Sequence, residues 1–270
     1  MAQSIASKVV IITGASSGIG AALALELASQ GARLVLGARR LDKQESIAAA
    51  CRAKGTEAIA VRCDVAHRED VQKLIQAAID RFGQLDVVVA NAGYGFLAKI
   101  QDVTDAEFDE IVAVNVKGSL YAMQEAAAVM RKKQAGHIIL ISSAAARRGL
   151  PLYGVYSMTK AAQLSLAEAM RVELRAEGGG VYVSTVHPIT TATEFFETAS
   201  QRSRIKSRGL GKPQTAELVA RKIARLIRHP RPELWPHSLS RFGLSFATYF
   251  PRFGDWIMAR MIGRRHGAGE

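Results

Sequence analysis

A phenol and an ammonium group four residues apart are the side chains of this chain best suited to moving a proton. Tyr156 and Lys160 stand at positions i and i+4 of a stretch with helical composition, so a helix places both on one face. A free tyrosine has a pKa of about 10, too high for ready proton exchange at neutral pH, and a nearby cation lowers that pKa. The pair therefore predicts general acid–base chemistry. Because the same spacing also occurs on ordinary helices, the prediction depends on the rest of the sequence.

A glycine-rich segment near the amino end provides that context. It lies between a β-branched run, Val9–Ile12, and a stretch of helical composition, Ile19–Gln30. Glycines at a strand-to-helix junction let the backbone turn tightly and approach a pyrophosphate, which then meets the N–H groups of the helix N-terminus. An ordinary tight turn is the alternative, and the strand–turn–helix context favours a dinucleotide site. Its predicted contacts are Gly14, Ser16, Ser17, Gly18, Ile19 and Gly20.

The spacing of these glycines, G-x-x-x-G-x-G, resembles that of the classical short-chain dehydrogenase/reductase family. The resemblance covers about residues 7–195. Further motifs carry it independently: Asp64-Val65, Asn91-Ala92-Gly93, Val114-Asn115-Val116, Ile141-Ser142-Ser143 and Tyr156-Ser157-Met158-Thr159-Lys160. They imply a catalytic tetrad of Asn115, Ser143, Tyr156 and Lys160.

The resemblance gives each member of this tetrad a role. Tyr156 protonates the developing alkoxide as hydride arrives from the nicotinamide, and Lys160 also holds the nicotinamide ribose. Ser143 hydrogen-bonds the substrate carbonyl oxygen and stabilises the charge that develops there; alignment with the family favours it over the adjacent Ser142. Asn115 ties a water to Lys160, and as an Asn within a predicted helix it also signals a kink.

The same resemblance implies contacts with the adenine end of a dinucleotide. The carboxylate of Asp64 faces the adenine amino group, and Val65 follows it in the chain. The motif after the fourth predicted strand stabilises the sheet and lines the adenine–ribose side; its residues are Asn91, Ala92 and Gly93.

The nicotinamide end departs from the family pattern. After the sixth predicted strand the family usually has Pro-Gly, whereas this chain has His187-Pro188-Ile189. Thr193 keeps the family spacing from Pro188 and is expected to contact the carboxamide or the phosphates. Ile189 lacks glycine's freedom to adopt positive φ and adds bulk near the nicotinamide. His187 is interpreted as a polar residue at a strand end rather than as a second catalyst, and the segment from Thr191 to about Gly211 is expected to cover the substrate.

The end of the second predicted strand indicates which nicotinamide is used. An acidic residue there would bind the ribose hydroxyls and repel a 2′-phosphate, but this position is the uncharged Ala38. Arg39 and Arg40 follow, and a guanidinium suits bidentate phosphate recognition. The pair favours NADP(H) over NAD(H), with Arg39 the stronger candidate. Two solvated arginines at the start of a helix are the alternative.

These residues together predict an oxidoreductase. We expect it to move a hydride between NADP(H) and a carbonyl or secondary alcohol carbon of an apolar substrate, such as a ketone, a steroid-like ring or a 3-oxoacyl thioester. No metal site is predicted. The rival is a catalytically silent sensor or scaffold protein that binds NADP(H) without turnover. The complete set of Ser143, Tyr156 and Lys160 favours the enzyme, since a binding module has no need of all three.

The elements that must position these residues alternate along the chain. Short β-branched runs alternate with Ala/Leu/Glu-rich stretches, which is typical of a parallel sheet wrapped by helices. The predicted fold is α/β: a doubly wound Rossmann-type parallel sheet of about seven strands, forming a single domain with a carboxyl-terminal helical extension. Residues 1–230 are the predicted catalytic domain and residues 231–270 the extension. Strands are predicted at Val9–Ile12, Leu34–Leu36, Ala58–Arg62, Val87–Ala90, His137–Ile141 and Val181–Val186, and helices at Ile19–Gln30, Lys43–Lys54, Arg68–Phe82, Asp105–Lys133, Ser157–Ala176 and Gln214–Arg228.

Composition narrows the class of protein further. Apolar residues make up 49% of the 270, and no apolar run reaches the roughly 18 residues that cross a bilayer. Two cysteines imply no disulfide framework, so the reducing cytoplasm is the expected location. The net charge of +12 is uneven, because residues 201–270 contain 15 Lys and Arg but 4 Asp and Glu, a net of +11.

The carboxyl-terminal extension is both basic and aromatic. Residues 231–260 hold seven of the 17 aromatic residues in the chain, and Leu239, Phe242, Phe246 and Tyr249 recur at helical spacing. Three interpretations compete: packing over the substrate cleft or a subunit interface, peripheral contact with anionic lipid at the inner membrane surface, and docking of an acidic carrier or CoA ester. Nucleic acid is not an expected partner, because no recognised binding motif is present. The family resemblance implies a homodimer or homotetramer.

Overall fold

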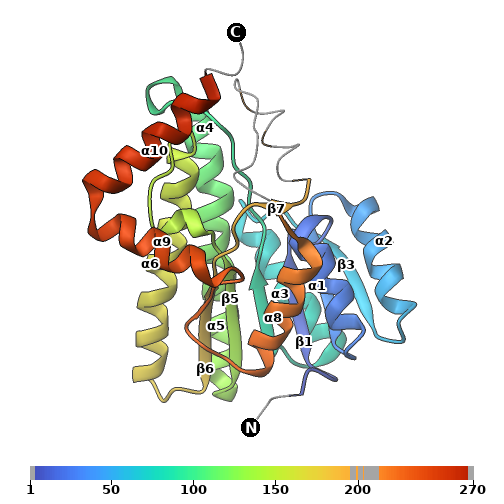
Figure 1. Cartoon of the computed structure of the whole chain (residues 1–270). Helices are drawn as coiled ribbons and strands as arrows, with labels where there is room; N and C mark the ends of the chain where they lie inside the picture. Colours follow the sequence, from blue (N-terminus) through green and yellow to red (C-terminus); the bar gives the residue numbers. More distant parts are fainter. Residues whose placement is uncertain (1–3, 195–198, 200–202, 204–212, 267–270) are drawn as a thin grey trace.

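A seven-stranded parallel sheet forms the centre of the computed structural model, which describes residues 4–194, 199, 203 and 213–266 (Figure 1). The strand order is β3-β2-β1-β4-β5-β6-β9. This order reverses direction between β1 and β4, the place where doubly wound folds bind ligands, and it confirms the predicted fold class. The strands are β1 (Val9–Thr13), β2 (Arg33–Ala38), β3 (Ala58–Arg62), β4 (Val87–Ala90), β5 (Gly136–Ile141), β6 (Val181–Val186) and β9 (Glu233–Leu234).

Helices cover both faces of this sheet. One face carries α1 (Gly18–Ala28), α2 (Leu41–Arg52) and α8 (Ala216–Arg228), and the other carries α3 (Arg68–Phe82), α5 (Gly118–Lys133) and α6 (Gly154–Ala176). Successive residues of β1 divide between the two cores: Val10 and Ile12 pack on the first face, and Val9 and Ile11 on the second. Each strand that is buried on both faces therefore shows a continuous apolar run instead of an alternating pattern.

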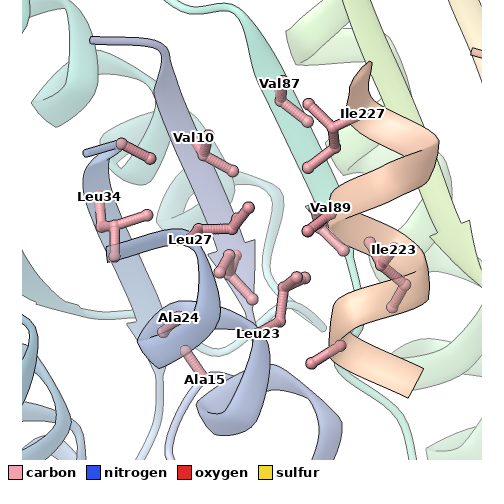
Figure 2. Close-up of a cluster of buried hydrophobic side chains, with 14 of the residues drawn as sticks. Val10, Ala15, Leu23, Ala24, Leu27, Leu34, Val87, Val89, Ile223 and Ile227 are labelled. Carbon is pink, nitrogen blue, oxygen red and sulfur yellow. The ribbon is translucent and has the colours of Figure 1, made fainter. Parts of the chain in front are cut away.

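Figure 2 shows the first of these cores. Leu23 and Leu27 of α1 and Ile223 and Ile227 of α8 lie around the side chains of β1 and β4, and every one of these four is fully or almost fully buried. The helix α8 begins well after residue 200, so the amino-terminal half needs the carboxyl-terminal quarter to complete this core. The glycine-rich segment, which joins β1 to α1, is thereby fixed on a rigid support.

The predicted long helix at Asp105–Lys133 is interrupted. The structure has α4 (Asp105–Ile111), a π-helical turn (Val112–Lys117) and then α5. A π-turn inserts an extra residue into the helical repeat and is common at functional sites. Its physical reason here is Asn115, whose side chain bonds the backbone of Tyr94 instead of pointing to solvent. The other predicted strands and helices are present, with ends shifted by a few residues.

The carboxyl-terminal quarter contributes to the sheet as well as to the surface. The strand β9, which lies beyond residue 230, pairs with β6 at the edge of the main sheet. A short second sheet joins β7 (Thr191–Ala192) and β8 (Gln214–Thr215). Two helices follow, α9 (Ser238–Tyr249) and α10 (Pro251–His266), drawn in red in Figure 1. Most of the segment predicted to cover the substrate, Thr191 to about Gly211, lies outside the described residues.

Candidate active site

A cavity of about 680 Å³ opens at the carboxyl ends of the central strands. Almost all the residues predicted to bind a dinucleotide or to catalyse line it, although they come from many separate segments of the chain. Two predicted residues, Gly20 and Asn115, are not part of the lining. The predicted residues in the wall are Gly14, Ser16, Ser17, Gly18, Ile19, Arg39, Arg40, Asp64, Val65, Asn91, Ala92, Gly93, Ser143, Tyr156, Lys160, Pro188, Ile189 and Thr193.

The glycine-rich turn between β1 and α1 has a shape that other residues could not adopt. Gly14 has a φ of 65°, and a Cβ atom on it would lie 2.8 Å from the Cα atom of Ala92. The Asn91 side chain fixes this approach by donating to the carbonyl oxygen of Thr13 at 2.9 Å. Ser17 precedes α1 but makes no side-chain capping bond to it. The turn lines the cavity directly before the N-terminus of α1, and this arrangement fits the pyrophosphate of a dinucleotide.

The two arginines after β2 take different positions. The Arg40 guanidinium donates to the hydroxyls of Ser16 at 3.1 Å and Ser17 at 3.0 Å, and it forms an ion pair with Glu194 at 3.0 Å. Arg39 lies 4.0 Å from a carboxylate oxygen of Asp64. Arg39 is the stronger candidate from sequence, whereas Arg40 is the arginine that contacts the glycine-rich turn in the structure.

Glu194 is a residue that the sequence analysis missed. Its carboxylate binds Lys43 and Arg40, and these hydrogen bonds hold its pKa below the ordinary value. An anionic group of the cavity wall thus already neutralises part of the charge of Arg40, and it binds Lys43 as well. The only signal in the sequence is a carboxylate next to Thr193, and nothing in the spacing links it to residues about 150 positions earlier.

Ser143 and Tyr156 meet at the other end of the cavity. The Ser143 side chain hydrogen-bonds the Tyr156 phenol. The hydroxyl of the adjacent Ser142 instead donates to the carbonyl oxygen of Lys160 at 2.9 Å, so this side chain is bound to the helix α6. The ring of Tyr153 packs edge-on against Tyr156, with 6.2 Å between the centroids.

Burial controls the ionisation of this centre. It raises the pKa of Tyr156 to about 12, although the bond from Ser143 opposes the shift. It also lowers the pKa of Lys160 to about 7. The prediction that the ammonium lowers the pKa of the phenol is therefore corrected: burial is the largest cause and raises the pKa of Tyr156, while the Lys160 Nζ lies 5.6 Å from the ring centroid.

A buried amide connects Lys160 to Asn115. The Lys160 Nζ donates to Gln163 Oε1 at 3.0 Å and to the carbonyl oxygen of Ile141 at 2.9 Å. Gln163 Nε2 donates in turn to the carbonyl oxygen of Asn115 at 2.8 Å, in the π-turn. The predicted water-mediated link between Asn115 and Lys160 thus has a side-chain counterpart in Gln163, which the sequence analysis missed. In the sequence, Gln163 is marked only by its position three residues after Lys160 on the same predicted helix. Its complete burial is visible only in the structure.

His187 holds the backbone of Ser143 from behind. Its Nδ1 lies 3.1 Å from the Ser143 carbonyl oxygen, which can only accept, so Nδ1 carries the proton and Nε2 accepts from the Thr185 hydroxyl at 2.9 Å. The imidazole stacks on Trp235, with centroids 4.5 Å apart, and burial lowers its pKa to about 4. A neutral, fully buried ring facing away from the cavity fits the interpretation as a strand-end residue. Ile189 stands where the family usually has glycine. It is tolerated there because its backbone does not adopt positive φ.

The carboxyl-terminal quarter supplies part of the cavity wall. His237, Ser240 and Leu244, at the start of α9 and within it, and Met258 of α10 line the cavity together with Leu150 and Tyr153. The described residues contain no group of three His, Cys, Asp or Glu that could hold a metal ion. No helix within the described ranges is long and apolar enough to span a membrane.

Known proteins with similar sequences are oxidoreductases. A family model described as short chain dehydrogenase matches residues 8–204. A Listeria monocytogenes protein named an uncharacterized oxidoreductase is 37% identical over 225 residues, which cover 81% of this chain and 91% of the relative. Glycine betaine reductase of Emericella nidulans is 36% identical over 231 residues, 84% of this chain and 18% of that relative.

Solved structures give the same result. A short-chain dehydrogenase/reductase from Burkholderia phymatum in complex with NAD has a TM-score of 0.85 and 26% identity, covering 93% of this chain and 96% of its own. An alcohol dehydrogenase from Thermococcus sibiricus, complexed with 5-hydroxy-NADP, has a TM-score of 0.75 and 30% identity, covering 85% and 95%. With the glycine-rich turn and the Ser143–Tyr156–Lys160 centre in one cavity, these matches establish that the chain belongs to the short-chain dehydrogenase family of oxidoreductases.

Proposed function

We propose that this chain catalyses the NADP(H)-dependent interconversion of an apolar ketone or aldehyde and its alcohol. One observation carries the proposal: Ser143, Tyr156 and Lys160 share a cavity with the glycine-rich turn and two arginines. A bound nicotinamide supplies or accepts the hydride. The protein's own residues must then hold the substrate oxygen, move a proton to or from it and exclude water.

Tyr156 is the proton donor in this proposal. Burial holds its pKa at about 12, so the phenol is protonated at neutral pH and can donate to a carbonyl oxygen as negative charge develops there. The Ser143 hydroxyl, already bonded to the phenol, stabilises the same charge. Lys160 lies near the phenol, and its ammonium is oriented by bonds to Gln163 Oε1 and to the carbonyl oxygen of Ile141.

This protonation state favours reduction and sets the expected pH dependence. Reduction requires the neutral phenol, which persists until the pH approaches about 12, so its kcat should not rise with pH. Alcohol oxidation requires the phenolate, so its kcat should rise with pH throughout the range above neutrality. A falling oxidation rate between neutral pH and about pH 10 would contradict Tyr156 as the group that exchanges the proton.

The preference for NADP(H) rests on charge at the end of β2. Ala38 brings no carboxylate to the place where one would repel a 2′-phosphate, and Arg39 and Arg40 line the cavity directly after it. The apolar substrate is inferred from the apolar side chains that line the cavity, among them Leu150, Leu244 and Met258.

The test is the absorbance at 340 nm during turnover of NADPH and NADH with a panel of apolar ketones and aldehydes. We expect NADPH to be preferred and Tyr156→Phe to lower kcat by about 10³-fold while cofactor affinity is retained. Tyr182→Phe is the matched control, since it removes the same hydroxyl from an exposed residue outside the cavity. Tight NADPH binding without turnover of any carbonyl compound would favour the silent sensor or scaffold instead.

A further inference from the structure

The outer side of the two carboxyl-terminal helices is strongly apolar. Seven large side chains of this segment are 47% to 82% exposed: Leu239, Phe242, Phe246, Tyr249, Phe250, Phe253 and Trp256. We call these seven the aromatic face. Monomeric soluble proteins rarely expose so many neighbouring apolar side chains, and where they do the patch usually binds something.

The aromatic face is continuous across the two helices. The ring of Phe246 in α9 lies 4.6 Å from that of Phe250 and 5.9 Å from that of Phe253 in α10. Phe253 in turn stacks on Trp256, also at 5.9 Å between centroids. These four rings therefore form one surface, and the helical spacing of Leu239, Phe242 and Tyr249 places them on the same side of α9 as Phe246.

The inner side of the same helices is firmly attached to the catalytic domain. The Arg148 guanidinium donates to the carbonyl oxygen of Ala247 at 2.6 Å and forms an ion pair with Asp255. Gly254 is buried against it, since a Cβ atom there would lie 2.7 Å from Arg148 Cζ. Ala247 is buried as well, so the helices have a packed side and a bare side, and the bare side is fixed in its outward orientation.

Positive charge accompanies the aromatic face. Arg241, Arg252 and Arg260 are exposed, and the Arg260 guanidinium lies 4.1 Å from the Trp256 ring centroid. Within residues 231–260 the two carboxylates, Glu233 and Asp255, are paired with the neighbouring arginines at 147 and 148. The charge left unbalanced on these helices is therefore positive.

Exposed aromatic rings together with unbalanced positive charge distinguish between two possible partners of the aromatic face, a second copy of the chain and a lipid surface. A second copy of the chain in a two-fold contact would bring two surfaces of the same positive charge together, which is unfavourable without facing carboxylates. A bilayer containing anionic phospholipid offers phosphates to the arginines and a headgroup–acyl boundary to Trp, Tyr and Phe, which are enriched there. Charge complementarity thus favours the lipid surface.

We propose that the aromatic face docks this enzyme on an anionic phospholipid surface. The same two helices also contribute Leu244 and Met258 to the cavity wall, so docking holds the cavity close to the lipid. A consequence, which rests on the proposed function, is that the carbonyl substrate enters from the membrane. The substrate class would then be a lipid-dissolved ketone or aldehyde.

The experiment is co-sedimentation of the full chain with vesicles of phosphatidylglycerol and phosphatidylcholine, or of phosphatidylcholine alone. We expect binding to the anionic vesicles that weakens with salt. Phe242→Ser/Tyr249→Ser should lower the partition coefficient at least about tenfold, since two exposed aromatic groups no longer enter the interface. Val172→Ser/Tyr182→Ser is the matched control: both are exposed on α6 and β6, away from the aromatic face, and binding should be unchanged.

Three results would overturn the proposal. One is wild-type protein that stays in the supernatant with anionic vesicles at low salt. Another is equal binding by the two double variants. The third is a concentration-dependent dimer that Phe242→Ser/Tyr249→Ser abolishes while vesicles bind neither form, which would assign the face to a second copy. Circular dichroism of both variants excludes misfolding, and sedimentation needs no turnover, so the docking proposal is judged separately from the enzymatic one.

Discussion

The catalytic centre and the aromatic face depart from the usual distribution of side chains in opposite directions. The centre buries polar groups: Lys160 is 4% exposed and Asn115 and Gln163 are fully buried. The aromatic face does the reverse, with Tyr249 82% exposed. Buried charge and exposed aromatic rings both cost free energy in a monomer in water.

The catalytic centre and the aromatic face each lower the stability of the folded chain, but for different gains in function. At the centre, desolvation alters the proton affinity of Tyr156 and Lys160, so the gain is chemical. At the aromatic face the gain comes only when a partner removes the rings from water. The two regions should therefore respond differently to substitution: the centre in activity, pH dependence and stability together, and the face in binding alone.

The largest expected effect is that of Lys160→Met. Activity should fall by about 10²- to 10⁴-fold, because the group that supports the phenol is lost. Stability at neutral pH should rise, because a buried ammonium is replaced by a side chain of similar length that has no charge to desolvate. Measurements of kcat and of urea unfolding test the two effects separately.

The pH dependence of that stability gain has a definite sign. In the unfolded chain the Lys160 pKa is 10.5, and in the folded chain burial lowers it to about 7. Between these values the unfolded state binds more protons, so the wild-type free energy of unfolding rises with pH through this term. The advantage of Lys160→Met should therefore be greatest at or below neutral pH and shrink by about pH 10. An advantage that is constant over this range would mean that Lys160 keeps its charge when buried.

Cofactor selectivity is the next effect in size. Arg40→Ala should raise the KM for NADPH by about 10- to 100-fold and leave that for NADH nearly unchanged, because only NADPH carries the 2′-phosphate. Arg39→Ala is the comparison that ranks the two arginines. Glu194→Gln should act oppositely and lower the KM for NADPH, since it removes the carboxylate that binds Arg40 and Lys43. Equal changes for both cofactors in Arg40→Ala and Arg39→Ala would exclude a phosphate contact.

A smaller effect is expected from Gln163→Leu, which removes the amide between Lys160 and Asn115 while keeping most of the volume. The reductive kcat should fall about tenfold and its pH profile should shift, because the buried ammonium of Lys160 loses a hydrogen-bond acceptor that favours its charged form. A residue needed only for packing would change the unfolding midpoint and leave the pH profile where it was.

The glycine-rich turn, the Tyr156–Lys160 pair and the central strands could be predicted from sequence, because each requires particular residue types at fixed spacing. A turn that brings Gly14 against Ala92 admits only glycine, and a proton-transfer pair on one helix requires Tyr156 and Lys160 at fixed spacing. Continuous apolar runs likewise predicted the central strands. These requirements are local, so they leave patterns that a single sequence shows.

The roles of Gln163 and Glu194 and the orientation of the aromatic face could not be predicted, because they depend on contacts between distant segments of the chain. Gln163 gains its importance from a π-turn about 50 positions earlier, and Glu194 from cations about 150 positions earlier. The same holds for the aromatic face. Helical spacing predicted a stripe at Leu239, Phe242, Phe246 and Tyr249, but which side of the helix meets the domain depends on where Arg148 lies. The sequence therefore left three interpretations of that segment open.

The smallest expected effect is the change in stability at the aromatic face itself. Phe242→Ser should alter the free energy of unfolding by less than about 0.5 kcal/mol, because Phe242 is 70% exposed and leaves no cavity when removed. Urea unfolding of the vesicle-free protein measures this, with Trp235→Ala, whose ring is 9% exposed and stacked on His187, as the destabilised reference at about 3 kcal/mol. A loss of more than about 1.5 kcal/mol in Phe242→Ser would mean that the ring is packed in solution. The face would then be part of an interface between copies, and the contrast with the catalytic centre would fail.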